Sequence, residues 1–73
     1  MSRTELNSPV TGTVWKVEYS VGDTVQEGDV IMILESMKME IPLEATTGGV
    51  VAELTVEPGV PVEEDQVLCV IES

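Results

Sequence analysis

An internal repeat at a constant offset of 37 residues is the feature that most limits the folds open to this 73-residue chain. The offset needs no gap and places identical residues on one another: Gly12 on Gly49, Val14 on Val51, Gly22 on Gly59, Val25 on Val62, Glu27 on Glu64, Val30 on Val67 and Glu35 on Glu72. Such a register indicates two copies of one supersecondary unit. Because each copy is too small to bury its apolar face alone, we expect the copies to pack on one another about a pseudo-twofold axis.

Short apolar runs punctuated by Gly or Pro indicate that the chain is all-β. No apolar stripe with a 3.6-residue period lasts for the length of a helix. Val14 and Trp15 break the alternation of the first run, which predicts a bulge near Trp15. The expected fold is a flattened β-barrel or sandwich. The predicted strands are residues 13–19, 30–34, 50–56 and 67–71.

The join between the two copies is expected at one end of the domain, with the chain termini at the other. We expect residues 1–73 to form one domain, with repeat halves at about 8–35 and 45–72 and a hairpin at 35–40. The domain should be a monomer in isolation.

Met37 and Lys38 are the predicted two-residue loop of this hairpin. With that loop, Leu34 faces Ile41 and Glu35 faces Glu40 across the hairpin. The two acidic side chains then lie directly opposite one another, which costs some stability. The pair lacks the Asn-Gly or Asp-Gly sequence that such loops usually show. Symmetry, rather than turn chemistry, therefore predicts that Lys38 lies at an exposed tip.

Charge and composition exclude several classes of function. Fourteen acidic side chains against three basic ones give a net charge of −11, which argues against nucleic acid or an anionic membrane as a partner. The chain has no histidine, and Cys69 is its only cysteine. We therefore expect no intrachain disulfide, no His/Cys metal site and no Ser-His or Cys-His catalysis. No run resembles a signal peptide or reaches membrane-spanning length, so we expect a cytoplasmic location.

The central stretch Glu35-Ser36-Met37-Lys38-Met39-Glu40 resembles the attachment motif of biotinyl domains, the biotin carboxyl carrier family. The resemblance covers nearly the whole chain, including the Ser8-Pro9 opening and the Gly48-Gly49 restart. It implies a flattened barrel of two four-stranded antiparallel sheets, with the lysine on a β-hairpin. Ser36 stands where many members have Ala. The gapless offset leaves no room for the "thumb" insertion of some bacterial carriers, so the contacts that a thumb makes to biotin should be absent.

The resemblance also implies a function. Lys38 would receive biotin in amide linkage from a biotin protein ligase and carry carboxybiotin from a biotin carboxylase to a carboxyltransferase. The carboxylase would be biotin-dependent and would act on an acyl-CoA, as in fatty acid biosynthesis. The chain itself would have no catalytic residues and would be a carrier subunit. Met37 and Met39 would be recognised by the ligase and contact the biotin arm, with Ser36, Glu35 and Glu40 flanking the hairpin.

Several alternatives stay open. A lipoyl carrier would share the fold, although lipoyl domains typically have Asp-Lys-Ala where this chain has Met37-Lys38-Met39. An acidic interaction domain that is never modified is the third candidate. Glu35 and Glu40 could form only a solvated rim, and Trp15 could serve packing or a partner contact.

Overall fold

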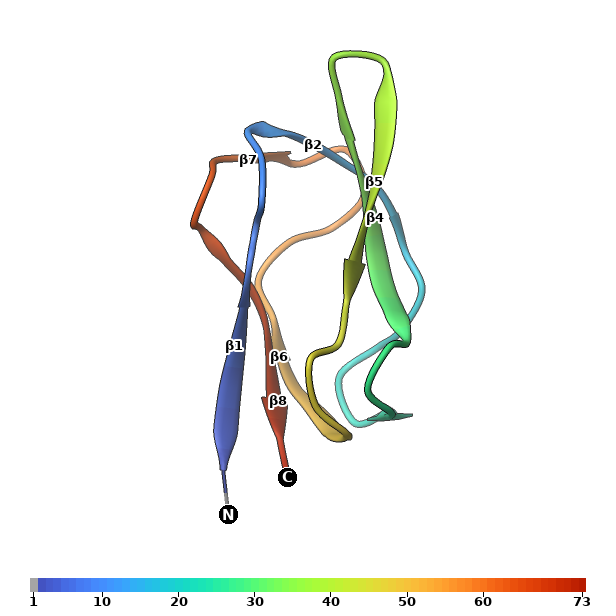
Figure 1. The fold of residues 1–73 in the computed structure, drawn as a ribbon, viewed down its shortest axis with the longest axis vertical. Helices are drawn as coiled ribbons and strands as arrows, with labels where there is room; N and C mark the ends of the chain where they lie inside the picture. The colour runs from blue at the N-terminus through green and yellow to red at the C-terminus, as the bar shows by residue number, and fades with distance from the viewer. Residues whose placement is uncertain (1) are drawn as a thin grey trace.

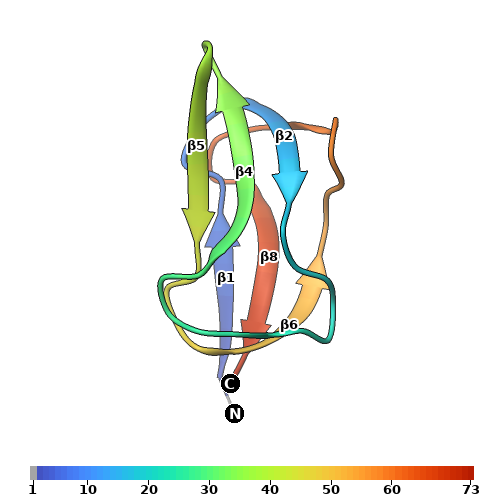
Figure 2. The ribbon, with the colours of Figure 1, turned by 90° about the vertical axis from the view of Figure 1, so that its right-hand side faces the viewer.

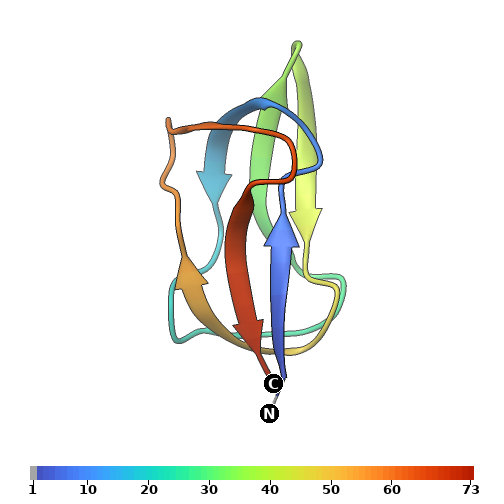
Figure 3. The ribbon, with the colours of Figure 1, turned by 90° about the vertical axis from the view of Figure 1, so that its left-hand side faces the viewer.

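The computed structural model describes residues 2–73, which form eight strands and no helix (Figure 1). The strands are β1 (Arg3–Asn7), β2 (Gly12–Val17), β3 (Thr24–Val25), β4 (Val30–Ser36), β5 (Met39–Glu44), β6 (Gly49–Leu54), β7 (Pro61–Val62) and β8 (Val67–Glu72). They form two four-stranded antiparallel sheets, with strand orders β1-β8-β6-β3 and β5-β4-β2-β7. Figures 2 and 3 show the two layers from opposite sides. The predicted fold class is therefore confirmed.

The 37-residue offset relates the two sheets strand by strand. Strands β1 to β4 shift onto β5 to β8, and the strand order of the first sheet becomes that of the second. Both copies also shift register at the same place, at Trp15 in β2 and at Ala52 in β6. The pseudo-twofold relation and the bulge near Trp15 are thus present as predicted.

The core lies between the sheets and is almost wholly aliphatic. The inner strands β4 and β8 supply most of it, and β2, β3, β6 and β7 each add a buried valine. Val30 and Ile33 of β4 are only partly buried. Their side chains lie at the start and on the outer face of β4. The fully buried members of the two inner strands are Ile31, Met32, Leu34, Leu68, Cys69 and Ile71.

The four predicted strands leave out β1, β3, β5 and β7, and two of them extend past the observed strand ends. Only Leu6 of β1 is buried, so the run Arg3–Asn7 has no apolar pattern and is held in the sheet by its pairing with β8. Strands β2 and β6 end two residues earlier than predicted, at Val17 and Leu54. The chain leaves both sheets there and enters the loops that lead to β3 and β7.

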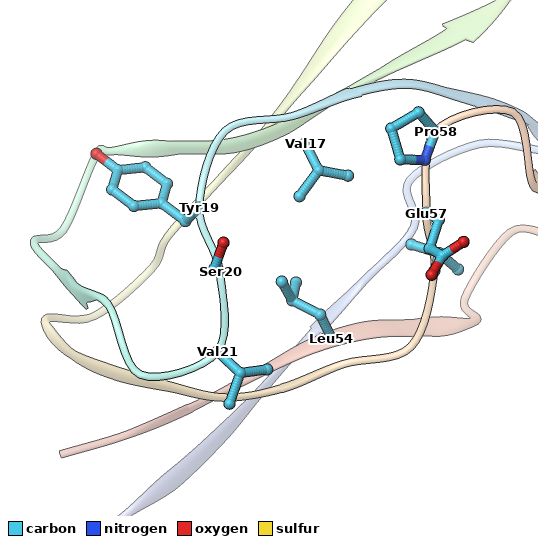
Figure 4. Close-up of a pocket in the computed structure, with 8 residues that line it drawn as sticks. Val17, Tyr19, Ser20, Val21, Leu54, Glu57 and Pro58 are labelled. Atoms are coloured by element: carbon cyan, nitrogen blue, oxygen red, sulfur yellow. The ribbon is translucent and has the colours of Figure 1, made fainter.

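These two loops flank a surface hollow of about 350 Å³ (Figure 4). Val17 and Leu54, which the repeat offset relates, both line it, so the hollow lies on the pseudo-twofold axis. It lies at the side of the barrel rather than at the β4–β5 hairpin. The hollow holds none of the predicted site residues.

We predict that Cys69 does not react with thiol reagents at neutral pH while the chain is folded. Its side chain is fully buried, and burial raises the pKa of the thiol from 9.0 to about 11, so the nucleophilic thiolate is scarce. Because the folded state holds this proton more tightly, the free energy of unfolding should fall as pH rises from about 9 to about 11. A colorimetric thiol assay with and without denaturant checks this, and rapid labelling of the native chain would contradict it.

Candidate functional site

The loop between β4 and β5 consists of Met37 and Lys38 alone. Their φ angles are +50° and +66°, so both residues adopt the left-handed conformation that two-residue hairpin loops of type I′ require. Neither is Gly, Asn or Asp, and the left-handed conformation costs an ordinary L-residue roughly 1–2 kcal/mol. Backbone strain of this kind is concentrated at functional sites. The loop thus holds Lys38 in a conformation that turn preference alone would not select.

The hairpin projects from one end of the molecule. Figure 1 shows the β4–β5 loop at the opposite end from the two termini, along the longest dimension of 36 Å. Met37 is 91% exposed, Met39 is 63% exposed, and Lys38 is exposed as well. The two methionines therefore lie on the surface.

The amine of Lys38 is free of ion pairs within residues 2–73. The other two basic side chains are paired: Arg3 with Glu53 and, at 2.8 Å, with Glu72, and Lys16 with Glu18 at 3.3 Å. The Lys38 side chain also forms no hydrogen bond with another described residue. The amine is therefore open to an incoming reagent.

Glu35 and Glu40 lie directly opposite one another across the hairpin, as predicted. The equivalent pair at the other end of the molecule is Arg3 and Glu72, which form an ion pair at 2.8 Å. The same position of the fold thus carries an attractive pair at the terminal end and a repulsive pair at the hairpin end. Both glutamates are exposed, so water screens the repulsion.

Ser36 fastens the base of the hairpin to the rest of the barrel. Its hydroxyl donates a hydrogen bond to the carbonyl oxygen of Thr11 at 2.9 Å. Gly12 follows directly, and a Cβ atom at Gly12 would lie 2.3 Å from the carbonyl oxygen of Glu35 and 3.1 Å from the Cβ of Ser36. Gly12, the first residue of β2, is therefore needed for the close approach of β2 to β4.

We predict that Gly12→Ala lowers the free energy of unfolding by about 1–3 kcal/mol, as overpacking does. The added methyl group would collide with rigid backbone below the hairpin. Gly48→Ala is the matched control, because a Cβ there would lie 3.5 Å from its nearest neighbour, an ordinary contact. Urea denaturation of both variants checks this. Equal stability of the two variants would show that the approach of β2 to β4 is not tight.

The structure brings all the predicted site residues together on one hairpin. Lys38 and Met37 form the loop, Ser36 and Met39 close it as the last paired residues, and Glu35 and Glu40 form the next pair. Thr11 and Gly12 support this hairpin and are not singled out as site residues by the sequence. The sequence signal that could have indicated this support is the recurrence of Gly12 as Gly49 in the repeat. Gly49 also allows a close approach, since a Cβ there would lie 2.5 Å from the carbonyl oxygen of Glu72.

This arrangement fits a prosthetic group joined covalently to the amine. An exposed, unpaired nitrogen on a narrow two-residue loop can enter the active site of a modifying enzyme, whereas no other basic side chain of residues 2–73 is both unpaired and at a loop tip. Residues 4–71 match the model of the protein family described as biotin-requiring enzyme. The chain belongs to the biotin/lipoyl attachment family. The predicted family is therefore confirmed, and so is biotin as the cofactor of that family.

Three similar proteins show how this family is represented. The biotin/lipoyl attachment protein of Bacillus subtilis is 44% identical over 59 residues, which cover 81% of this chain and 81% of that protein. The biotin-dependent acyl-coenzyme A carboxylase alpha3 subunit of Mycobacterium leprae is 41% identical over 66 residues, or 90% of this chain and 11% of that protein. The crystal structure of the Kluyveromyces lactis urea carboxylase matches 99% of this chain and 6% of that chain, with a TM-score of 0.91 and 36% identity.

The attachment family thus includes a protein of about this length and also short segments of much larger carboxylases. This chain spans only a small part of the carboxylase polypeptides that it matches. Within residues 2–73, no helix has the length and apolar character to cross a membrane.

Proposed function

We propose that this chain is a biotin carboxyl carrier and that Lys38 is the residue to which biotin is attached. The observation that carries the proposal is the Lys38 amine, which is exposed on a strained two-residue loop and has no ion-pair partner among residues 2–73. Residues 1–73 form one attachment domain, with 35–40 as the attachment hairpin. The carrier is a monomer in isolation and is located in the cytoplasm, where a ligase can draw on ATP.

The chain's own residues present the amine and hold it in place. In the ligase, the neutral Nζ of Lys38 would attack the carbonyl carbon of a biotinyl adenylate. The amide C–N bond would form as the C–O bond to AMP breaks, and the nitrogen would lose a proton. Met37 and Met39 offer exposed apolar surface to the ligase on both sides of the amine. Ser36 fixes the base of the hairpin through its hydrogen bond to Thr11, so the loop that carries Lys38 is held against the barrel.

Biotin, when bound, supplies a ureido nitrogen that can carry a carboxyl group. The lysine stem and the cofactor's acyl chain make an arm of roughly 10–15 Å on ordinary bond dimensions. Such an arm lets the carrier serve a biotin carboxylase site and then a carboxyltransferase site at high effective concentration. The chain contributes presentation and reach rather than catalysis, since it has no histidine and its only thiol is buried.

The carboxylase that it serves is proposed to act on an acyl-CoA. The support is the alpha3 subunit of the acyl-coenzyme A carboxylase, which is 41% identical over 90% of this chain. The urea carboxylase that shares the fold shows that related domains also occur in a carboxylase of another substrate class. Activity of the reconstituted carboxylase with a panel of acyl-CoA substrates and urea distinguishes these acceptors.

Expression of the chain in cells with an active biotin ligase tests the proposal. We expect the intact mass to rise by one biotinyl group, streptavidin to recognise the product, and peptide mapping to place the group on Lys38. A lipoyl increment would favour the lipoyl carrier that the name of the Bacillus subtilis relative includes. An unmodified Lys38 would end the proposal and favour the acidic interaction domain.

A further inference from the structure

Trp15 is a large aromatic side chain that lies outside the buried core. It lies at the bulge of β2 and is 49% exposed, whereas Val14 before it is buried. Its counterpart Ala52 occupies the equivalent bulge of β6 with the same change of register. Since a methyl group suffices at one end of the molecule, the indole at the other end is available for a role beyond packing.

A hollow of about 400 Å³ lies beside Trp15. The residues that line it are Thr13, Val14, Trp15, Glu35 and Gly59. The repeat offset carries all five positions onto a second hollow at the other end of the molecule, where Ala52 replaces Trp15. The two hollows therefore differ in the indole, in Thr13, which Val50 replaces, and in their position relative to Lys38.

The hollow beside Trp15 is within reach of a group attached to Lys38. Glu35, on its rim, precedes Lys38 by three residues, which is about 10 Å along the strand. Strand β2 lies next to β4, about 4.8 Å to the side. Because the loaded arm extends roughly 10–15 Å, its end can lie over the hollow without any change in the backbone. The second hollow is lined by Ser73, near the termini at the far end of the molecule, and is out of reach.

We propose that biotin attached to Lys38 rests its ring system on the indole of Trp15 in this hollow. The inference depends on the proposed function, because it requires biotin on Lys38. The thioether half of the ring system suits an aromatic face, as sulfur–aromatic contacts do. The ureido half has N–H donors and a carbonyl acceptor, which the Glu35 carboxylate and the Thr13 hydroxyl on the rim can complement.

The resting site gives the carrier two states of the arm, one folded back onto β2 and one extended for an active site. The hollow is open and its polar groups are exposed, so the contact is readily broken when a partner enzyme takes the ring. A partner protein is the competing occupant of the hollow. If a partner rather than the arm occupies it, biotinylation of the isolated chain leaves the indole unchanged.

Trp15 is the only tryptophan of the chain, so its fluorescence reports on this one site. The biotinylated chain, with modification established by intact mass, is compared with the unmodified chain. We expect the acrylamide quenching constant to fall about twofold on biotinylation, because the ring would cover one face of a half-exposed indole. The indole N–H resonance in the ¹H–¹⁵N spectrum of the unmutated chain should shift as well, and this second measurement needs no variant.

The matched control is the double variant Trp15→Ala/Ala52→Trp, which moves the only indole to the equivalent bulge at the far end. Its quenching should be the same with and without biotin, once circular dichroism shows that it folds. Equal quenching and an unshifted indole resonance in the unmutated, biotinylated chain would overturn the resting site while leaving the proposed function intact. Failure of biotin to attach to Lys38 would instead overturn the proposed function, and the resting site with it.

Discussion

Lys38→Ala is expected to abolish biotin labelling completely and to change the free energy of unfolding by no more than about 0.5 kcal/mol, as surface substitutions usually do. The side chain is exposed and makes no ion pair within the described part of the chain, so its removal leaves the core unchanged. Alanine also loses little at a loop position that methionine and lysine already occupy at positive φ. Streptavidin blotting and urea denaturation of the same preparation check both halves.

Lys16→Ala is the control for this experiment. Lys16 is exposed like Lys38, but it lies within β2 and pairs with Glu18 at 3.3 Å. We expect this variant to be labelled normally and to lose little stability, since an exposed ion pair contributes only about 0–1 kcal/mol. Labelling that survives Lys38→Ala and disappears with Lys16→Ala would move the attachment site to β2. A large loss of stability in Lys38→Ala would mean that the hairpin supports the core.

The symmetry of the fold could be predicted from the sequence because identical side chains recur at one offset. Val14, Val25 and their partners in the second copy are buried for the same reason in both sheets. The position of Lys38 at one end follows from that symmetry alone. By contrast, β1 could not be predicted, because its run Arg3–Asn7 is polar and the backbone pairing with β8 holds it in place.

The support of the hairpin could not be predicted, because it depends on contacts between residues distant in sequence. Gly12 and Glu35 are 23 positions apart, and only the folded chain shows that a Cβ would collide with the Glu35 carbonyl oxygen. The loop itself contradicts local preference, since Met37 and Lys38 adopt left-handed conformations without Gly or Asn. Local rules therefore fail at the proposed attachment site, where pairing of the flanking strands imposes the turn.

Leu34→Ala is expected to lower the free energy of unfolding by about 2–5 kcal/mol, which is the range for truncating a buried leucine. Leu34 is fully buried and pairs with Val14 of β2 and Ile41 of β5, so its removal leaves a cavity between three strands. A chain of this size is expected to be stable by only about 4–11 kcal/mol. The variant should therefore unfold at a much lower urea concentration, which circular dichroism measures.

Val30→Ala is the control for Leu34→Ala, because both residues are apolar and lie in β4 but only Leu34 is fully buried. Val30 begins β4 and is only partly buried, so we expect its truncation to lower the free energy of unfolding by about 1 kcal/mol. Because Leu34 directly precedes Glu35 at the base of the proposed attachment hairpin, its variant also tests whether presentation of Lys38 depends on the core. The folded fraction should still be labelled, since the Ser36–Thr11 bond and the β4–β5 pairing remain. Equal losses in the two variants would show that the core does not extend to the base of the hairpin.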